Sequence, residues 1–464
     1  MMKIRNALVV GAVVALPFFA TQATAKVGAA EAAKLGGELT MVGAIAGANG
    51  DGSIGAYEGK KGFTERELTV TYAEIEDMSE AEQDELFQAS TKNDNPIFTI
   101  TKDNYKDYAA DLSEGHKALF GKFPSYTMPV FKTRRPVFFP KAIEEATKAN
   151  ATTAYLESPD GIRGSTLGFP FPIPTSGPEP IWNHKMKFRG DGVTRYNDQA
   201  IVKTDGTYKL TQVVEDVLFM YANLEKPGKA EDDYLLYYLQ TDLGASGSRT
   251  LVHETSDQAA SPRNAWLYTK SFGRLKRAPN VGYDNPSQTS DGEQFNDQVD
   301  MFNGAMNLYD WKLVGKQEKY IAYNSTRLNS PLLKYADILK AGHLNQGYTR
   351  YEKHRVWVVE GTQRKGAPKE HKLSKRVFYI DEDSWNIAMV DGYNKAGQLW
   401  KFQEGHILAA PFVPTASAVP EIIYDLRSGR YFTTAMVNEQ KVNDFSARFK
   451  EKFFRPSNVA KRIK

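Results

Sequence analysis

The sequence predicts a mainly β protein of the α+β class, with one large curved antiparallel sheet that carries helices and a proline-rich segment on its concave side. Three observations predict it. The hydrophobic period changes to two after Gly190, and strand-like runs in the C-terminal third follow one another through hairpin turns. Five prolines between positions 170 and 180 interrupt an aromatic segment just before this region. Because an open sheet of this size must curl, its inner face has to be filled by side chains, a helix or a ligand.

The composition is that of an ordinary globular protein with one large core or two domains. The chain has 464 residues, of which 41% are hydrophobic and 25% charged, and its net charge is +3. This near-balance, without a dense basic patch, argues against a nucleic-acid partner. The chain contains no cysteine, which excludes disulfides, thiol catalysis and a lipid-bearing N-terminal cysteine.

The N-terminus has the pattern of a signal peptide. Lys3 and Arg5 precede an apolar run over 7–20, and Ala23-Thr24-Ala25 is a small-x-small cleavage site. The apolar run is shorter than the roughly twenty residues that span a bilayer. We therefore expect residues 1–25 to be removed after Ala25, which implies export to the periplasm without a lipid anchor.

Residues 26–165 are expected to form an N-terminal helical and irregular extension that packs on the sheet, and residues 166–464 the β domain. Helical patterns cover Ser79–Ser90, Asp103–Phe120 and Pro140–Asn150, with a weaker one in the Ala-rich stretch 26–39. Residues 123–139 form a proline-broken aromatic segment, and its Arg134-Arg135 pair is interpreted as solvated.

The segment 47–58 partly matches a calcium loop. Asn49, Asp51, Ser53 and Glu58 fall at ligand positions of an EF-hand pattern, but Gly47 occupies the first position and no flanking helices are predicted. Turn chemistry explains the same Asn, Asp and Gly residues. We interpret the segment as a plain loop and expect neither a metal nor a cofactor.

The segment Gly168–Gly190 is predicted to be extended, stiff and buried, because its prolines fix φ and remove backbone donors. Apolar side chains lie between the prolines, and Lys185–Arg189 is interpreted as the first strand-like run of the sheet. Period-two runs follow, with Asp205-Gly206 as a strong hairpin signal. The main runs are 194–203, 208–221, 234–240, 249–254, 265–269, 312–324, 348–360, 375–380, 385–393, 399–407, 421–425 and 430–437.

Catalytic patterns are weak in this chain. Its seven histidines have no metal-ligand spacing, and 244–248 departs from a nucleophile elbow by one residue. His184 is the one histidine in an aromatic setting, and we interpret it as a core residue in preference to a catalytic one. Asp381-Glu382-Asp383 is interpreted as a solvated turn rather than a glycosidase carboxylate pair. The basic run Lys270–Arg277 is interpreted as a solvated strand edge.

Several blocks resemble a family of exported bacterial proteins of unknown function that are labelled outer-membrane lipoprotein-sorting proteins. The blocks are GFPFPIPTSGPEPIWNH (168–184), NAWLYTKSFGRLKRAP (264–279), MFNGAMNLYDWKLVGK (301–316), YEKHRVWVVEGT (351–362), KRVFYIDEDSWNIAMVDGYN (375–394) and GANGDGSIGAYEG (47–59). The resemblance implies a half-open barrel of the LolA/LolB type around an apolar cavity. It also implies a carrier or accessory that works near a transporter of the resistance-nodulation-division type or an outer-membrane porin-like protein. It supplies no catalytic residues.

The sequence thus favours a non-enzymatic periplasmic carrier for lipid or another hydrophobic molecule. One alternative is a structural adaptor in an outer-membrane or efflux complex, whose concave face is filled by its own side chains. The other is a lipid or glycan hydrolase that uses His184 and nearby acids. For the carrier, the side chains expected to line the cavity are Phe169, Phe171, Ile173, Trp182, Trp266, Tyr268, Trp357 and Trp400.

Overall fold

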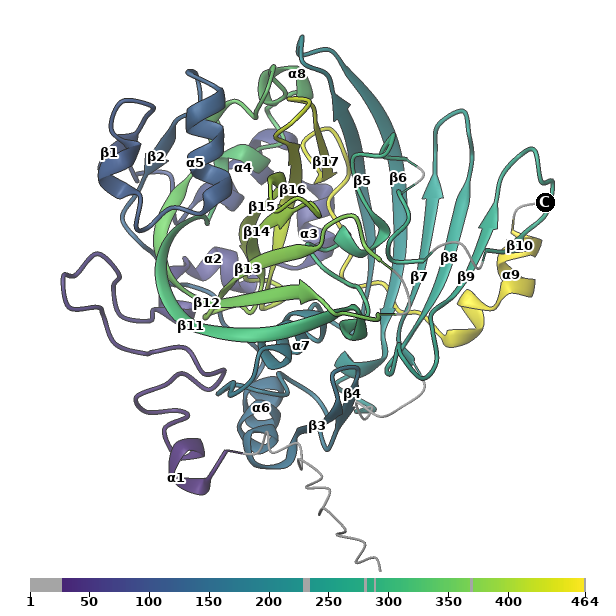
Figure 1. Cartoon of the computed structure of the whole chain (residues 1–464), viewed down its shortest axis with the longest axis horizontal. Coiled ribbons are helices and arrows are strands. Elements are labelled where there is room, and N and C mark those ends of the chain that lie inside the picture. Colours follow the sequence, from purple (N-terminus) through teal and green to yellow (C-terminus); the bar gives the residue numbers. More distant parts are fainter. Residues whose placement is uncertain (1–26, 228–233, 279–281, 288, 368–369, 463–464) are drawn as a thin grey trace, which may run out of the picture.

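A single antiparallel sheet organises the protein in the computed structural model (Figure 1). The structure describes residues 27–227, 234–278, 282–287, 289–367 and 370–462; the expected signal peptide lies outside them. Within these ranges the sheet has 15 strands, and neighbouring strands follow the order β1-β2-β12-β13-β14-β15-β16-β17-β5-β6-β7-β8-β9-β10, with β11 paired to the other side of β12. The pairing is antiparallel except for a single parallel step between β12 and β2. This confirms the predicted mainly β fold with a large antiparallel sheet.

The strands are of two kinds, long ones in the body of the sheet and short ones at its periphery. The body contains β5 (Gly192–Val202), β6 (Tyr208–Phe219), β7 (Tyr234–Asp242), β8 (Arg249–Thr255), β9 (Asn264–Tyr268), β11 (Tyr309–Ala322), β12 (Tyr351–Gln363), β13 (Lys375–Asp381), β14 (Ile387–Tyr393), β15 (Leu399–Ala410), β16 (Thr415–Asp425) and β17 (Tyr431–Met436). The periphery contains β1 (Phe98–Ile100), β2 (Met128–Val130) and β10 (Lys276–Arg277), and a separate hairpin of β3 (Tyr155–Ser158) and β4 (Gly161–Arg163).

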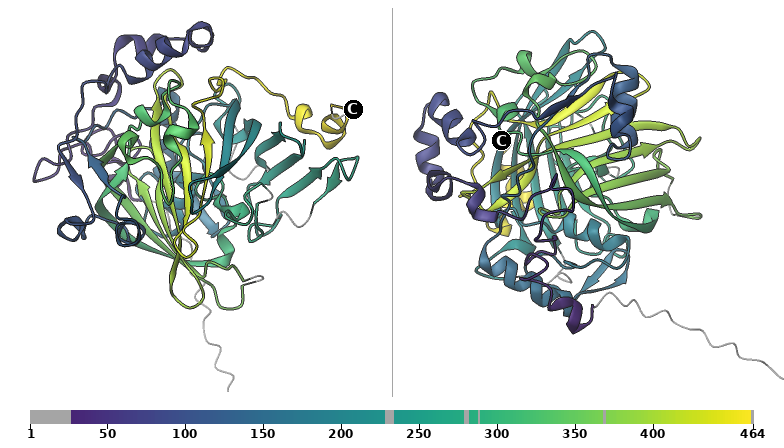
Figure 2. Two further views of the ribbon diagram at one scale, coloured as in Figure 1. Left: turned by 90° about the horizontal axis from the view of Figure 1, so that it is seen from above. Right: turned by 90° about the vertical axis from the view of Figure 1, so that its left-hand side faces the viewer.

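The helices are short and lie mostly before the sheet in the chain. They are α1 (Ala29–Ala32), α2 (Glu65–Thr69), α3 (Tyr72–Asp77), α4 (Glu80–Gln88), α5 (Glu114–Lys122), α6 (Lys141–Thr153), α7 (Pro178–Lys185), α8 (Tyr335–Ile338) and α9 (Pro456–Lys461). Figure 2 shows α2–α4 grouped together at the edge of the molecule. In the part of the chain that the structure describes, every helix is too short or too polar to cross a membrane.

Local sequence signals explain where several elements begin. The Ser79 side chain accepts from the Glu82 amide and Glu82 reaches back, so a capping box starts α4 within the predicted helix 79–90. The hairpin between β5 and β6 turns at Gly206, whose φ of +85° suits glycine, as the Asp-Gly signal predicts. The predicted helix over 103–120 is wrong in its first half: a 3₁₀ turn at Tyr105–Tyr108 precedes α5.

The proline-rich segment contains a helix, contrary to the prediction of extended chain. Helix α7 begins at Pro178, so both Pro178 and Pro180 lie in its first turn. The first N–H groups of a helix have no intrahelical acceptor, and prolines there remove nothing. The preceding stretch is held to the helix by Asn183, which accepts from the Phe171 amide at 2.9 Å and donates to the Phe171 carbonyl at 2.7 Å. Lys185 ends this helix, so the strand predicted over Lys185–Arg189 is absent and β5 starts at Gly192.

The concave side of the main sheet is filled by the protein's own side chains. Phe169 and Trp182 are fully buried in the same core cluster as Trp385 and Phe402. Helix α5 packs directly on β14 and β15, where the Gly115 amide donates to Asp391 at 2.8 Å. Phe169 packs edge-on against Phe139 with ring centroids 5.0 Å apart. The aromatic segment therefore plugs this part of the sheet instead of roofing an empty space.

Candidate functional site

An apolar cavity of about 200 Å³ lies where strands β6–β9 extend beside this plugged region. The strands supply the inner wall and the loops around 286–303 supply the outer one. We call it the β6–β9 cavity. Its apolar lining comprises Val217, Phe219, Leu235, Leu236, Val252, Leu267, Pro286, Val299 and Phe302. The volume is below the range of about 300–1,000 Å³ that drug-sized ligands occupy, so it suits a small molecule or one part of a larger one.

The strand register explains why these side chains face one another. Val217 is paired with Tyr238 and Tyr238 with Val252, so the three residues form one row across β6, β7 and β8. Directly paired residues of an antiparallel ladder project from the same face. A second row runs from Gln240 through Thr250 to Leu267. Both rows line the cavity, which is therefore a product of the sheet's regular alternation.

One wall of the β6–β9 cavity is charged. Arg189 donates to Asp300 at 2.7 Å, and Lys187 donates to the same carboxylate oxygen at 2.7 Å. Arg195 forms an ion pair with Glu215 at 2.8 Å. On the other side of the wall, Arg263 is paired with Glu254, and Lys185 donates to the Gln258 side chain and the Gly304 carbonyl, both at 3.0 Å.

Burial and neighbouring charge shift the pKa values along this wall. Burial opposes ionisation of Asp300, but Arg189 and Lys187 together lower its pKa well below the usual range. Burial, and then Asp300, raises the pKa of Glu421 to about 8. Burial lowers the pKa of Lys185 to about 8. Buried acidic and basic side chains thus lie close together along this wall, and each shifts the pKa of its neighbours.

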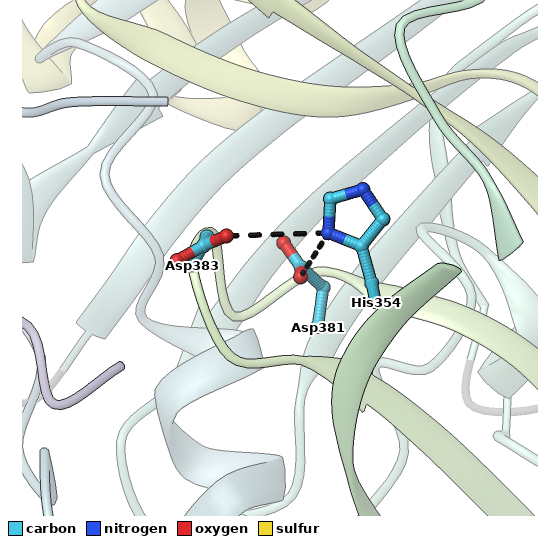
Figure 3. Close-up of side chains that lie close together, drawn as sticks. All are labelled: His354, Asp381 and Asp383. Carbon is cyan, nitrogen blue, oxygen red and sulfur yellow. Dashed lines mark ion pairs between the residues drawn. The ribbon is translucent and has the colours of Figure 1, made fainter. Parts of the chain in front are cut away.

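A second group of titratable residues is buried at the end of β13. Figure 3 shows His354 facing Asp381 and Asp383. The His354 Nδ1 atom lies 3.8 Å from Asp381 Oδ1 and 4.0 Å from Asp383 Oδ2. The acid run 381–383 was predicted to be a solvated turn, and that prediction is wrong because all three side chains are at most 1% exposed. Their counter-charges come from distant segments, namely Arg135, Arg355 and Lys316.

The spacing of His354, Asp381 and Asp383 would allow these three side chains to hold a metal ion, since one ligand atom of each lies within 4.8 Å of the others. Two features bear on this. Both Asp383 oxygens already accept from Arg135, at 2.7 and 2.8 Å. Asp381 Oδ1 is buried without a hydrogen-bond partner, and burial, then Asp383, raises the pKa of Asp381 to about 6. A proton on Asp381 thus relieves the same repulsion between Asp381 and Asp383 that a cation would relieve.

The structure confirms the interpretation of His184 as a core residue, because its side chain is buried. Its Nε2 atom lies 2.7 Å from the Asp300 carbonyl, and its Nδ1 atom accepts from the Ile387 amide at 3.0 Å. Burial, then Lys187, lowers its pKa to about 3. Both ring nitrogens are thus engaged with backbone groups, an arrangement that holds α7 against the sheet and gives no support to the hydrolase alternative.

The interpretation of Arg134-Arg135 as a solvated pair is also wrong, because Arg135 is buried. The Arg135 side chain is 1% exposed and binds the 381–383 run. The guanidinium of Arg134 is half-buried and donates to the Gly62 carbonyl at 2.9 Å. In contrast, the edge strand β10 within Lys270–Arg277 is exposed, as expected.

The 47–58 segment is a loop closed by its own side chains. Asp51 Oδ1 accepts from the Ser53 amide at 2.9 Å, and Asn49 Oδ1 accepts from the Ile54 amide at 2.9 Å. Glu58 turns away from them and accepts from the Arg135 amide at 3.2 Å. The structure therefore agrees with the interpretation of this segment as a loop, in which Asn and Asp side chains accept hydrogen bonds from nearby backbone amides.

The eight side chains expected to line a cavity lie outside the β6–β9 cavity. Phe169, Phe171 and Trp182 are buried in the main core, and Ile173 packs in a small cluster with α1. The others are partly buried: Trp266 and Tyr268 lie on β9, Trp357 on β12 and Trp400 on β15. Among the described residues, none of the eight lines the neighbouring cavities of about 160 Å³ and 550 Å³ either.

Sequence reasoning missed the charged wall and the long-range partners of the 381–383 run. One signal was available: Lys185, Lys187 and Arg189 alternate through a segment otherwise rich in apolar residues. The partner Asp300 lies in a polar, irregular stretch that carries no pattern of its own. Its role appears only when the fold brings it within 2.7 Å of both Lys187 and Arg189.

Comparisons with known proteins bear on the family. The family model described as "Protein of unknown function (DUF1329)" matches residues 99–460. An uncharacterized protein of Pseudomonas aeruginosa is 40% identical over 464 residues, which cover 98% of each chain. A Vibrio parahaemolyticus crystal structure of a domain attributed to outer-membrane lipoprotein sorting is similar at 15% identity, with a TM-score of 0.41 over 61% of this chain and 97% of that one.

A LolA superfamily protein of Nitrosomonas europaea is similar at 11% identity, with a TM-score of 0.34 over 59% of this chain and 93% of that one. The family match and the 40% identical relative each span most of the chain. They confirm the resemblance carried by the quoted blocks of the sequence: this chain belongs to the DUF1329 family of proteins of unknown function.

Proposed function

We propose that the protein is a non-enzymatic carrier that binds a lipid or another hydrophobic molecule in the β6–β9 cavity. The observation that carries this proposal is the paired row of Val217, Tyr238 and Val252, which lies along a partly open, mainly apolar cavity. Burying a ligand methylene against such a surface is worth about 0.8 kcal/mol. We further propose that the chain acts after export to the periplasm.

The cavity's position favours ligand binding over simple imperfect packing. Strands β6–β9 continue the same sheet whose other half is tightly filled, and a bulge at the start of β7 brings the successive residues Leu235 and Leu236 both into the lining. Enclosed spaces lined by apolar side chains with a few polar groups at one wall are the usual form of small-molecule sites.

Binding is tested by displacement of an environment-sensitive hydrophobic dye, together with native mass spectrometry of the purified chain. The variant Thr250→Trp places a large ring into the second row of the cavity and should abolish dye binding. Its control is Gln212→Trp on β6, an exposed position outside the cavity lining, which should bind like the parent protein. Equal dye binding by both variants, or no binding by the parent, would refute the proposal.

A structural adaptor is the second candidate, because one observation favours it. The main concave face is occupied by Phe169, Trp182 and helix α5, which leaves no passage there for cargo. In this case the chain would bind an envelope partner such as a transporter of the resistance-nodulation-division type or a porin-like protein. Capture of such a partner by the Thr250→Trp variant, with unchanged yield, would favour the adaptor over the carrier.

A further inference from the structure

We infer that the ligand of the β6–β9 cavity is an amphiphile with an anionic head, of the class of medium-chain carboxylates. This inference rests on the proposed function and specifies its ligand. The head would lie at the charged wall and the chain along the paired rows of β6–β8.

The first support is the charge of the lining. Its charged side chains are four cations, Lys185, Arg189, Arg195 and Arg263, and two carboxylates, Glu254 and Asp300. Among the described residues the lining itself therefore carries two more positive than negative charges, and Glu215, which lies outside the lining and pairs with Arg195 at 2.8 Å, balances one of them. Buried charges of one sign in excess are costly unless an opposite charge is brought to them. A ligand carboxylate supplies that charge.

The second support is the set of unsatisfied hydrogen-bonding groups. Among the described lining residues, the buried side-chain atoms that lack a partner are the Nε groups of Arg189, Arg195 and Arg263. Each is an N–H donor and none can accept. The Nε atoms themselves are covered by neighbouring atoms, but they show that these three guanidinium groups have fewer acceptors than donors, which is unfavourable for buried groups. An acid head brings two oxygens, whereas an alcohol brings one and an ammonium none.

The acids behind the wall do not satisfy these donors. Glu215 accepts from the Asn197 side-chain Nδ2 at 2.7 Å and from the Tyr238 hydroxyl, besides its pair with Arg195. Glu421 accepts from the Met301 amide at 3.1 Å, and its raised pKa keeps it largely protonated near neutral pH. Asp160 interacts with Lys185 from the far side and accepts from the Met306 amide at 2.8 Å.

The apolar remainder of the cavity selects against small inorganic anions. Val217, Leu235, Val252, Leu267 and Phe302 line it together with the arginines. A free phosphate or acetate ion would leave this surface uncovered. A single alkyl chain covers it and places the head at one end.

The experiment compares three ligands that share a ten-carbon chain: decanoate, decanol and decyltrimethylammonium. Each displaces the dye from the full-length mature chain at pH 8, where decanoate is ionised. We expect decanoate to bind about tenfold or more tightly than decanol, the size of effect that hydrogen bonds to charged groups produce. Decyltrimethylammonium should bind weakest. Decyl phosphate is added as a fourth ligand to distinguish a carboxylate head from a phosphate head.

A variant pair localises the effect. Arg263→Met with Glu254→Gln removes one lining ion pair together, so that neither charge is left alone. This double variant should bind decanoate about tenfold more weakly than the parent protein, with an unchanged affinity for decanol. The matched control is Lys401→Met with Glu293→Gln, a pair of similar burial at 2.6 Å that lies outside the cavity lining. This control should have the parent protein's affinities for both decanoate and decanol.

The outcomes separate this inference from the proposed function. Equal affinity for decanoate and decanol would overturn the inference and leave the hydrophobic carrier standing. Tighter binding of decyl phosphate than decanoate would overturn the carboxylate assignment. Binding of no ligand, with the parent protein folded, would overturn the carrier itself.

Discussion

Arg135 and Asp383 lie 248 residues apart in the chain and form a two-pronged ion pair in its interior. Arg135 Nε donates to Asp383 Oδ2 at 2.8 Å and Nη2 donates to Oδ1 at 2.7 Å. The pair fastens the segment around Arg135, which follows β2, to the turn after β13. Planar pairing of this kind fixes orientation as well as charge.

Replacing Arg135 should therefore be among the most damaging single changes in this region. Arg135→Met leaves Asp383 and Glu382 buried with less counter-charge, and we expect a loss of about 3–5 kcal/mol in the free energy of unfolding. Urea unfolding measures it. The control is Arg66→Ala, whose pair with Glu74 is solvent-exposed and should cost about 0–1 kcal/mol. Equal losses in the two variants would contradict the role of the buried pair.

Asp381 should make stability depend on pH in the direction opposite to an ordinary surface carboxylate. Burial and Asp383 raise its pKa to about 6 in the folded protein, above an unfolded value of about 3.9. The folded state then holds the proton more tightly, so the stabilisation is complete below the unfolded pKa and is lost as the pH rises through about 6. The parent protein should lose stability relative to Asp381→Asn between pH 4.5 and 7.

Urea unfolding at a series of pH values checks this expectation. The control is Asp205→Asn in the exposed β5–β6 turn, where hydrogen bonds from Thr207 lower the pKa of the aspartate. Between pH 5 and 7 the difference between the parent and this control should stay constant. A difference for Asp381→Asn that is also flat over this range would contradict the raised pKa of Asp381.

Helix α5 offers a matched pair of glycines. A Cβ on Gly115 would lie 2.0 Å from Phe402 Cδ2, whereas Gly121 in the same helix has open space around it. Gly115→Ala should lower the free energy of unfolding by about 1–3 kcal/mol through overpacking. Gly121→Ala should be neutral or stabilise by up to about 1 kcal/mol. Thermal unfolding of both variants tests whether α5 is seated on β15 as closely as the structure has it.

His184 should remain neutral across the physiological range. Burial, then Lys187, lowers its pKa to about 3, and both ring nitrogens are engaged with backbone groups. The ring resonances of ¹⁵N-labelled protein should show one fixed tautomer from pH 8 to pH 5. Titration with a midpoint near 6.5, the usual value for histidine, would reopen the hydrolase alternative.

The sequence patterns that held were local ones. Asp205-Gly206 needs only its own neighbours to turn, and the capping box at Ser79 and Glu82 is closed within one helical turn. The alternation of the C-terminal strands likewise depends on nearby residues and predicted the antiparallel sheet. These signals were sufficient for the fold class.

Two of the predictions that failed, those for the 381–383 run and for the cavity, depend on contacts between distant segments. From sequence alone, Asp381-Glu382-Asp383 is predicted to be a solvated turn. In the structure it is buried, because Arg135, Arg355 and Lys316 supply counter-charges from other segments. The α7 helix differs from the predicted extended segment for a local reason, since Pro178 and Pro180 lie in its first turn, where a proline removes no intrahelical hydrogen bond. The cavity was missed because its wall depends on strand register: Val217, Tyr238 and Val252 become neighbours only when β6, β7 and β8 pair.

The most direct test of the carrier is a crystal structure of the protein grown with 10-bromodecanoate. The account predicts an anomalous bromine peak among Val217, Val252 and Leu267, with the carboxylate at the wall of Arg189 and Arg263. A bromine peak elsewhere on the molecule, or an empty β6–β9 cavity at saturating ligand, would contradict it.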